Sequence, residues 1–174
     1  ASRAKHPAPA GSSRFAAGGP GPLKQQFRVQ PSGRVEGIIS VPGDKSVSHR
    51  ALMLGAIAQG TSRVTGFLPG EDCLATMAAV RAMGIEVIQH DPTTIDVGGQ
   101  GMHGFRAAGR ALDMGNSGTA MRLFMGLLAA QPFATELFGD ESLSRRPMER
   151  VAQPLRQMGA RIETTQGTPP VRIA

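Results

Sequence analysis

Apolar and polar positions divide the chain into a first part without periodicity and a regular remainder. Residues 1–26 are rich in Ala, Gly, Pro and Ser, which is typical of a disordered basic tail or linker. A targeting segment is the alternative, because these residues include bases and no acid. From Phe27 onward, short alternations predict strands, and longer apolar runs at helical spacing predict helices. The folded region is therefore expected to span residues 27–174.

The regular part predicts strands and helices that alternate along the chain. Strands are expected at residues 27–29, 35–41, 61–67, 86–89, 94–97, 133–138, 161–164 and 171–173. Helices are expected at residues 47–58, 71–83, 119–130 and 148–158, and Pro154 predicts a kink in the last of them. The polar stretches 98–110 and 139–147 are expected to be loops.

An internal repeat organises these elements. The pattern Arg-x-Met-Gly occurs at residues 81–84 and returns 75 residues later at 156–159. Each occurrence falls in a unit that reads β-α-β-α-β-β, with the units at about 35–98 and 109–174. Repeated supersecondary units bury their helices against neighbouring units, so the sequence predicts an α/β (α+β) fold built from stacked repeats.

Charge raises the question of nucleic acid, but its distribution argues against such a partner. The chain has 19 Lys and Arg against 13 Asp and Glu, a net charge of +6. Four of the bases lie in the first 26 residues, which leaves 15 bases against 13 acids in the remainder. The chain also lacks Trp and Tyr, whose rings often stack on single-stranded bases. Composition therefore disfavours nucleic-acid binding.

Cysteine and histidine usage predicts no metal or disulfide. Cys73 is the one cysteine, so an internal disulfide is excluded, and the four His show no zinc-type spacing. No apolar run approaches the roughly 18 residues that a membrane span requires. We expect no metal, no cofactor and no membrane contact.

The first candidate site is the strand-to-helix turn at residues 41–50, Val-Pro-Gly-Asp-Lys-Ser-Val-Ser-His-Arg. Ser46 or Ser48 is expected to cap the helix, and Lys45 and Arg50 place two cations near its start. Free backbone N–H groups, the helix dipole and the cations all favour a phosphate or carboxylate. Asp44 interrupts the Gly-Lys-Ser pattern of a nucleotide-binding loop, and a capped helix with ordinary surface charges is the alternative.

The second candidate site combines the turn at residues 115–119, Gly-Asn-Ser-Gly-Thr, with the pair Arg145-Arg146 before Pro147. Gly118 allows a ligand to approach the backbone closely, because no Cβ intervenes. Adjacent arginines before a helix suit bidentate anion binding, although a solvated basic loop is the alternative. Arg122 is interpreted as a structural pairing partner and is left out of the site.

Two further residues near these turns are interpreted as structural. His49 is expected to be a helix surface residue and not a base. Cys73 is expected to serve packing, although it lies beside Asp72. Asp72 itself is either an acid of the site or simple charge complementarity at a helix start.

Four segments resemble one enzyme family in order and spacing. They are PGDKSVSHRALMLGAIAQG (42–60), GEDCLATMAAVRAMG (70–84), LDMGNSGTAMRLFMGLLAA (112–130) and GDESLSRRPMERVAQPLRQMGA (139–160). Together they resemble the first part of the EPSP synthase (3-phosphoshikimate 1-carboxyvinyltransferase) family, over residues 29–174. The resemblance implies helices inside and sheets outside, with this chain supplying two of the three units of one domain.

The resemblance also implies a reaction and a set of site residues. The reaction is transfer of the enolpyruvyl group of phosphoenolpyruvate to the 5-hydroxyl of shikimate 3-phosphate, in the shikimate pathway of aromatic amino acid biosynthesis. The implied catalytic residues are Lys45 and Asp72. The implied shikimate 3-phosphate contacts are Lys45, Ser46 and Arg50. The implied phosphoenolpyruvate contacts are Lys45, Asn116, Gly118, Thr119 and Arg146.

The same resemblance implies that the chain needs a partner segment. The family takes an Asp and a Lys-Glu pair for acid–base chemistry from its other domain, and this chain has no counterpart of them. We therefore expect a cytoplasmic enzyme portion that is inactive without the remaining C-terminal segment. Gly118 is the residue typical of glyphosate-sensitive members, so no intrinsic tolerance is expected from it.

Three alternatives stay open at this point. A non-catalytic anion-binding module would bind shikimate 3-phosphate without turnover. A relative of UDP-N-acetylglucosamine enolpyruvyl transferase is disfavoured, because that enzyme has Lys-Asn where this chain has Lys45-Ser46. A nucleic-acid-binding domain would show steep salt-dependent binding through the basic tail.

Overall fold

A computed structural model describes residues 28, 30 and 36–174 of the chain. Residues 40–174 form one compact unit. The predicted tail at 1–26 lies outside the described residues, as does most of the predicted strand at 27–29. The expected strand at 35–41 is wrong over its described part, because residues 36–41 form no strand. Ile38, Ile39 and Val41 are exposed, and no described strand pairs with them.

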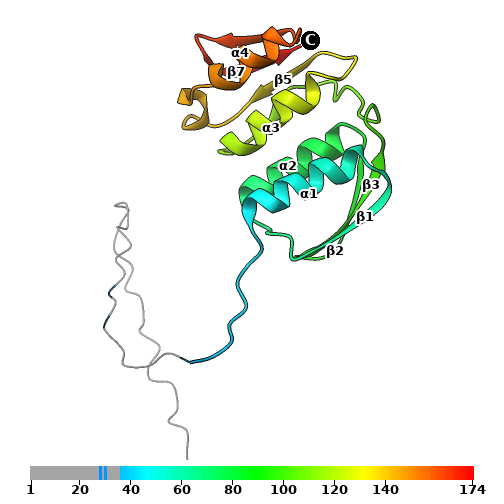
Figure 1. Cartoon of the computed structure of the whole chain (residues 1–174), viewed down its shortest axis with the longest axis vertical. Helices are drawn as coiled ribbons and strands as arrows, with labels where there is room; N and C mark the ends of the chain where they lie inside the picture. Colours follow the sequence, from blue (N-terminus) through cyan, green and yellow to red (C-terminus); the bar gives the residue numbers. More distant parts are fainter. Residues whose placement is uncertain (1–27, 29, 31–35) are drawn as a thin grey trace, which may run out of the picture. The chain divides into compact units, whose positions relative to one another are not determined.

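The first sheet is antiparallel and is accompanied by two helices (Figure 1). Its strands stand in the order β1-β3-β2. The elements are α1 (Lys45–Ile57), β1 (Gln59–Thr65), α2 (Glu71–Ala82), β2 (Glu86–Asp91) and β3 (Thr94–Gln100). The predicted hairpin around Asp91-Pro92 is confirmed, with Val87 opposite Val97 in the register of β2 and β3.

The second sheet has four strands in the order β4-β5-β7-β6. Strands β4 and β5 are parallel, and the other pairs are antiparallel. The elements are β4 (Leu112–Asp113), α3 (Gly118–Leu128), β5 (Thr135–Phe138), the 3-10 helix η1 (Leu143–Arg145), α4 (Glu149–Gln157), β6 (Ile162–Thr165) and β7 (Thr168–Ile173). The prediction of mixed helices and sheets is confirmed. Strand β4 was not predicted, because two residues are too few to show an alternation.

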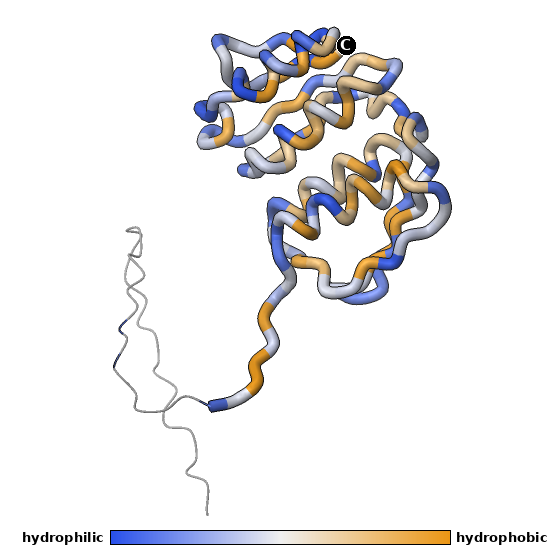
Figure 2. Tube along the Cα trace, in the orientation of Figure 1, coloured by the Kyte–Doolittle hydropathy of each residue, from blue (hydrophilic) through white to orange (hydrophobic). Residues whose placement is uncertain are grey.

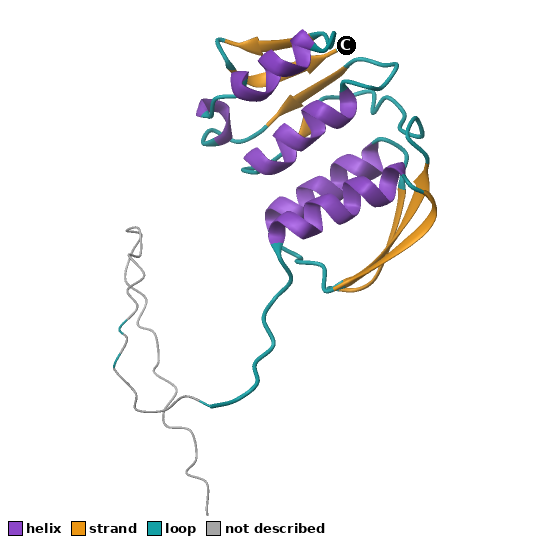
Figure 3. Ribbon diagram, viewed as in Figure 1, coloured by secondary structure: helices purple, strands orange, loops and turns teal. Residues whose placement is uncertain are grey.

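The core lies where α1, α2 and α3 stand between the two sheets (Figure 3). Apolar residues recur along these helices and strands (Figure 2). Because the chain has no Trp or Tyr, the core is filled mainly by Met, Leu, Ile, Val and Phe. Fully buried examples are Leu52, Met83, Ile95, Met121, Phe124 and Leu137. Burying one such side chain stabilises the fold by roughly 1.5–3 kcal/mol.

The start of α1 differs from the sequence prediction. Asp44 caps the helix in place of Ser46 or Ser48, because its Oδ1 accepts a hydrogen bond of 2.7 Å from the Val47 N–H. The helix therefore begins at Lys45, two residues earlier than predicted. Ser48 is buried and accepts from the Leu68 N–H at 3.0 Å, which ties α1 to the chain before α2.

Among the described residues, no helix has the length and apolar character that crossing a bilayer demands.

Candidate functional site

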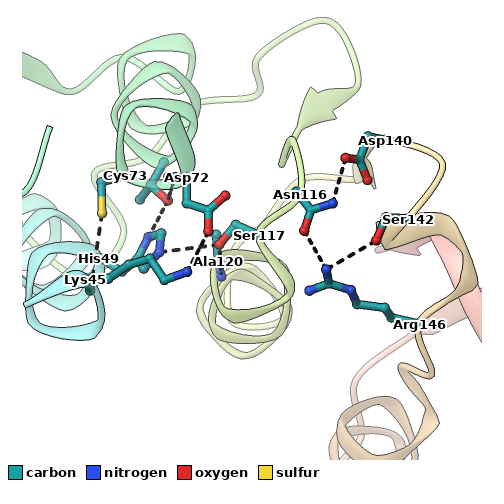
Figure 4. Close-up of polar contacts among 11 residues, drawn as sticks. Lys45, His49, Asp72, Cys73, Asn116, Ser117, Ala120, Asp140, Ser142 and Arg146 are labelled. Atoms are coloured by element: carbon teal, nitrogen blue, oxygen red, sulfur yellow. Dashed lines mark hydrogen bonds and ion pairs between the residues drawn. The ribbon is translucent and has the colours of Figure 1, made fainter. Parts of the chain in front are cut away.

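The first half of the candidate site lies at the starts of α1 and α2. Lys45 is the first residue of α1, and Asp72 lies in the first turn of α2. Their side chains form an ion pair, with Lys45 Nζ 2.9 Å from Asp72 Oδ2 (Figure 4). The hydrogen bond and the charge of Asp72 raise the pKa of Lys45, so the ammonium stays protonated. The Lys45 side chain remains 54% exposed and accessible to a ligand.

Ser46 and Arg50 occupy the same face of α1, one turn apart. Both are exposed, and Arg50 Nη1 donates to the Ser46 carbonyl oxygen at 3.0 Å. This contact holds the guanidinium near the start of the helix, where the dipole also favours an anion. Lys45, Ser46 and Arg50 are therefore gathered at one helix start, as the sequence predicts.

The second half lies at the start of α3. Ser117 caps α3 by accepting from the Ala120 N–H at 3.1 Å. The neighbouring Asn116 joins two segments, because its Nδ2 donates to Asp140 Oδ2 at 2.7 Å and its Oδ1 accepts from Arg146 Nη2 (Figure 4). Arg146 Nη2 also contacts Ser142 Oγ at 3.4 Å. The structure thus brings Asn116 and Arg146 together across 30 residues of sequence.

Asp140 supports this half of the site and was not predicted. Its Oδ1 accepts from the Leu143 N–H at 2.7 Å, which orders the loop before Arg146. The hydrogen bond from Asn116 comes first among the causes that lower the pKa of Asp140. The sequence signal was present, since Asp140 stands three residues before Leu143 at the position of a turn cap.

Gly118 lies close to the guanidinium groups of Arg122 and Arg146. A Cβ at this position would stand 2.7 Å from Arg122 Nη1 and 3.2 Å from Arg146 Nη1. Arg122 donates from Nη2 to the Pro147 carbonyl at 3.1 Å. Burial lowers the pKa of Arg122, and the charges of Arg150 and Arg146 lower it further. Several positive charges therefore gather beside the start of α3.

The sequence predicts that Arg122 is a structural pairing partner. The structure shows that it does pair with backbone carbonyl groups, those of Gly118 and Pro147. It also lies close enough to Gly118 to limit the space above that residue. Its spacing of four residues after Gly118 places both on one face of α3, and this was the available signal.

His49 contradicts its sequence interpretation as a surface residue. The side chain has no exposed surface and lies between α2 and α3. Its Nδ1 is 2.8 Å from Thr76 Oγ1, and its Nε2 is 3.4 Å from Ser117 Oγ. Burial is the main cause that lowers the pKa of His49 below its ordinary value. The uncharged ring therefore belongs to the interior that joins the two halves of the site.

Cys73 has the packing environment that the sequence predicts. It is buried in α2, and its Sγ contacts the Lys45 carbonyl oxygen at 3.7 Å. Burial raises the pKa of the Cys73 thiol, which disfavours the nucleophilic thiolate. Among the described residues, no group of three or more His, Cys, Asp or Glu is arranged to hold a metal ion.

Together, the two halves form a site suited to more than one anionic group. Helix starts supply free backbone N–H donors, and Lys45, Arg50 and Arg146 supply charge. The charge of Arg146 also acts on Lys45 and opposes the rise in the pKa of Lys45. Thr119 is half-buried in the first turn of α3, beside Gly118.

Known proteins share this sequence and this fold. The family described as EPSP synthase (3-phosphoshikimate 1-carboxyvinyltransferase) matches residues 29–174. The 3-phosphoshikimate 1-carboxyvinyltransferase of Methylococcus capsulatus is 58% identical over 149 residues, which cover 85% of this chain and 34% of that protein. The enzyme of the same name from Hydrogenovibrio crunogenus is 55% identical, over 85% of this chain and 34% of that protein.

Solved structures agree with the sequence matches. An EPSP synthase from Acinetobacter baumannii superposes with a TM-score of 0.76 at 58% identity, covering 78% of this chain and 31% of that chain. This chain spans about a third of the length of the curated relatives that it matches. Because the family match covers nearly all described residues, the chain belongs to the EPSP synthase family.

Proposed function

We propose that this chain supplies part of the substrate cleft of a 3-phosphoshikimate 1-carboxyvinyltransferase. The reaction transfers the enolpyruvyl group of phosphoenolpyruvate to the 5-hydroxyl of shikimate 3-phosphate and releases phosphate. The observation that carries the proposal is the pair of helix starts, one with Lys45 and Arg50 and the other with Gly118 beside Arg146. The two substrates carry two phosphates and two carboxylates between them, which requires such a collection of donors.

Each half of the site has a proposed substrate. Ser46 and Arg50 bind shikimate 3-phosphate at the start of α1. Asn116, Gly118, Thr119 and Arg146 bind phosphoenolpyruvate at the start of α3. Lys45 contacts both substrates. Its exposed ammonium lies at the start of α1, and the charge of Arg146, in the other half of the site, acts on its pKa.

The chemistry runs through a tetrahedral intermediate. Protonation at C3 of phosphoenolpyruvate allows the 5-hydroxyl oxygen to form a bond to C2, with loss of the hydroxyl proton to a base. Loss of a C3 proton then restores the double bond as the C2–O bond to phosphate breaks. Lys45 neutralises charge that develops on the phosphate, and Asp72 holds the ammonium in place through the 2.9 Å contact. The acid and base that move these protons come from the part of the enzyme beyond this match.

An apolar groove supports the need for a partner segment. It lies between α1 and α3, has a volume of about 340 Å³ and is lined by Arg50, Met53, Leu54, Ile57, Leu123 and Leu127. Leu54 is 61% exposed there, although it sits in a helix of the core layer. We propose that the remaining C-terminal segment covers this groove and completes the cleft, and that the enzyme works in the cytoplasm.

The direct test is calorimetric binding of shikimate 3-phosphate to the full chain. We expect wild-type binding, and loss of most of it in K45A, because the ammonium is central to the α1 half. The matched control is R161A, which removes an exposed arginine before β6. Equal binding by K45A and the wild type would contradict the proposal.

Binding of other ligands and a turnover assay distinguish the other candidate functions. Binding of a UDP-sugar in place of shikimate 3-phosphate would favour the sister enolpyruvyl transferase. Binding to single-stranded nucleic acid with a steep salt dependence would favour a nucleic-acid function. Binding of shikimate 3-phosphate without turnover, even after the remaining segment of a relative is added, would favour a non-catalytic anion-binding module.

A further inference from the structure

A buried histidine connects the two halves of the site. His49 extends from α1 and lies between Thr76 of α2 and Ser117, the residue that caps α3 (Figure 4). A polar ring with no exposed surface costs free energy unless its nitrogens are hydrogen-bonded. Both ring nitrogens have a hydroxyl partner, so the ring is matched on both sides.

The hydrogen positions follow from the partners on the α2 side. Thr76 Oγ1 donates to the Asp72 carbonyl oxygen at 3.2 Å, which uses its single hydrogen. The same oxygen is 2.8 Å from His49 Nδ1, and it must therefore accept there. This assigns the ring hydrogen of neutral His49 to Nδ1.

The α3 side is consistent with that tautomer. Ser117 Oγ accepts from the Ala120 N–H at 3.1 Å, which leaves its hydroxyl hydrogen for another acceptor. His49 Nε2 carries a lone pair in the Nδ1–H tautomer and lies 3.4 Å away. One continuous chain of hydrogen bonds then runs from the Ala120 N–H through Ser117, His49 and Thr76 to the carbonyl of Asp72.

We propose that His49 is a positioning residue that fixes the start of α3 relative to the starts of α1 and α2. Asp72, at one end of this series of hydrogen bonds, forms an ion pair with Lys45. Ser117, near the other end, directly precedes Gly118. The inference rests on the proposed function, because the spacing matters only if the two starts bind two substrates that must meet.

The charges around the ring keep it neutral near pH 7. Lys45 and Arg50 of α1 disfavour the imidazolium, whereas Asp72 of α2 favours it, and α3 contributes the uncharged Ser117. Burial outweighs these charges and lowers the pKa of His49. Protonation therefore begins only below the ordinary value of about 6.5. It puts a hydrogen on Nε2 and reverses the direction of the contact with Ser117.

The stability consequence has a definite sign. The unfolded chain binds the His49 proton more readily than the folded chain does. Stability from this residue is therefore complete above about pH 6.5 and is lost as the pH falls through the lower folded value.

The test uses NMR on the full 174-residue chain. Ring-nitrogen spectra should show the Nδ1–H tautomer of His49. Acid titration should move the Ser117 and Gly118 amide signals together with the His49 ring. H49Q should abolish the acid-dependent movement, and H103Q, a change at an exposed histidine, should preserve it. An Nε2–H tautomer, or identical titrations in the wild type and H49Q, would overturn the proposal.

Ligand titration tests the link between the halves. In the wild type, shikimate 3-phosphate bound at Lys45 and Arg50 should shift the Gly118 and Thr119 amides. H49A should weaken binding about tenfold, in line with the loss of one buried hydrogen-bond partner, and should remove most of that shift. The amide that H49Q introduces is able to hydrogen-bond to a hydroxyl group, so this variant should retain more of the shift.

The possible failures point to different conclusions. If wild-type chain does not bind shikimate 3-phosphate, the proposed function fails, while the acid titration still decides the role of His49. If binding occurs and H49A leaves the Gly118 shift unchanged, the positioning role fails and the proposed function stands.

Discussion

The two sheets of the protein have the same strand connections, but the helices that accompany them are buried to different extents. In the first, the strand order is β1-β3-β2, and in the second, β5-β7-β6 follows the same sequence of connections with β4 added at the edge. Arg81 donates to the Val87 carbonyl, and Arg156 donates to the Ile162 carbonyl. Each arginine thus ties the end of a helix to the strand that follows it.

Helices α2 and α4, which precede the last two strands of the first and second sheets, differ in how much of their surface is buried. In α2, buried residues include Cys73, Met77 and Val80, whereas the one buried residue of α4 is Ala152. Helix α2 packs against α1, α3, β2 of the first sheet and β4 of the second, whereas α4 contacts β6 and α3 and leaves a large face exposed. Shared connections therefore place the helices, and the surrounding layers decide which faces are buried.

The largest expected effect is a difference in stability between alanine substitutions of the glycines at the two helix starts. A Cβ on Gly43 would stand 1.8 Å from the Gly66 carbonyl oxygen, a backbone atom that has little room to move. G43A should lower the free energy of unfolding by about 3 kcal/mol, as expected for severe overpacking. At Gly118 the nearest atom is the flexible end of Arg122, so G118A should cost much less. Urea denaturation of both variants measures the difference.

The G118A variant also serves as the control for folding. It should unfold near the wild-type midpoint while weakening phosphoenolpyruvate binding in the completed enzyme, because the methyl group crowds Arg146. Equal destabilisation by G43A and G118A would contradict this prediction, because it would mean that the two helix starts are equally constrained.

The next prediction concerns the substrate that we propose for each helix start. In the chain complemented by the remaining segment of a relative, R146A should raise the KM for phosphoenolpyruvate on the order of 30-fold, because it removes a charged hydrogen-bond donor. Its effect on the KM for shikimate 3-phosphate should be small. R50A should show the reverse pattern. Steady-state kinetics with each substrate varied in turn gives both values.

A matched control for this pair is R145M. Arg145 precedes Arg146 but is paired with Glu141 and is exposed. The R145M substitution should leave the KM values for both substrates near those of the wild type. Should R145M and R146A behave alike, the loop would act as a general basic surface, without the specific contact between Arg146 and Asn116.

A smaller loss of stability is expected when Arg81 or Arg156, which donate to backbone carbonyl groups, is replaced. R81M removes a guanidinium that donates to the Val87 carbonyl at 2.6 Å and 3.2 Å, and it should cost about 1 kcal/mol of stability. R156M should also destabilise the chain, because Arg156 donates to Ile162 at 2.7 Å and pairs with Glu149. Thermal unfolding of both variants checks this, and an unchanged midpoint in R81M would remove the arginine from the account.

The smallest expected effect concerns the Lys45–Asp72 pair. Its members are partly exposed, so D72N should change the free energy of unfolding by less than about 1 kcal/mol. The same change should weaken shikimate 3-phosphate binding, since Lys45 loses the partner that orients it. A large loss of stability without loss of binding would reassign Asp72 to folding.

The fold was predictable where a local pattern decides the structure. The predicted helix at 71–83 is observed at Glu71–Ala82, and the one at 119–130 is observed at Gly118–Leu128. Both have apolar periodicity and a start that the sequence marks clearly. The expected strand at 35–41 failed because a strand needs a partner, and alternation along one segment does not show whether a partner exists.

The site was predictable in its elements and less so in its contacts. Lys45, Asn116 and Arg146 are predicted because they stand at turns before helices and match the motifs of the family, and the structure places Asn116 in contact with Arg146. The capping role of Asp44 was not predicted, because Ser46 and Ser48 are also residue types that cap helices and the sequence does not show which side chain reaches a free N–H. The burial of His49 had a signal, since Leu52, Met53 and Ala56 follow it at helical spacing on one buried face. The substrate roles of individual residues stay predictions.

The most direct test of the central claim is phosphate release from phosphoenolpyruvate and shikimate 3-phosphate. We predict no release by the purified chain and release after the remaining segment of a family member is added. The chain spans about a third of the curated relatives that it matches, and we propose that the acid and base lie in the rest of the enzyme. Turnover by the chain alone would contradict the account and would make Asp72 the first residue to examine as the missing catalytic acid.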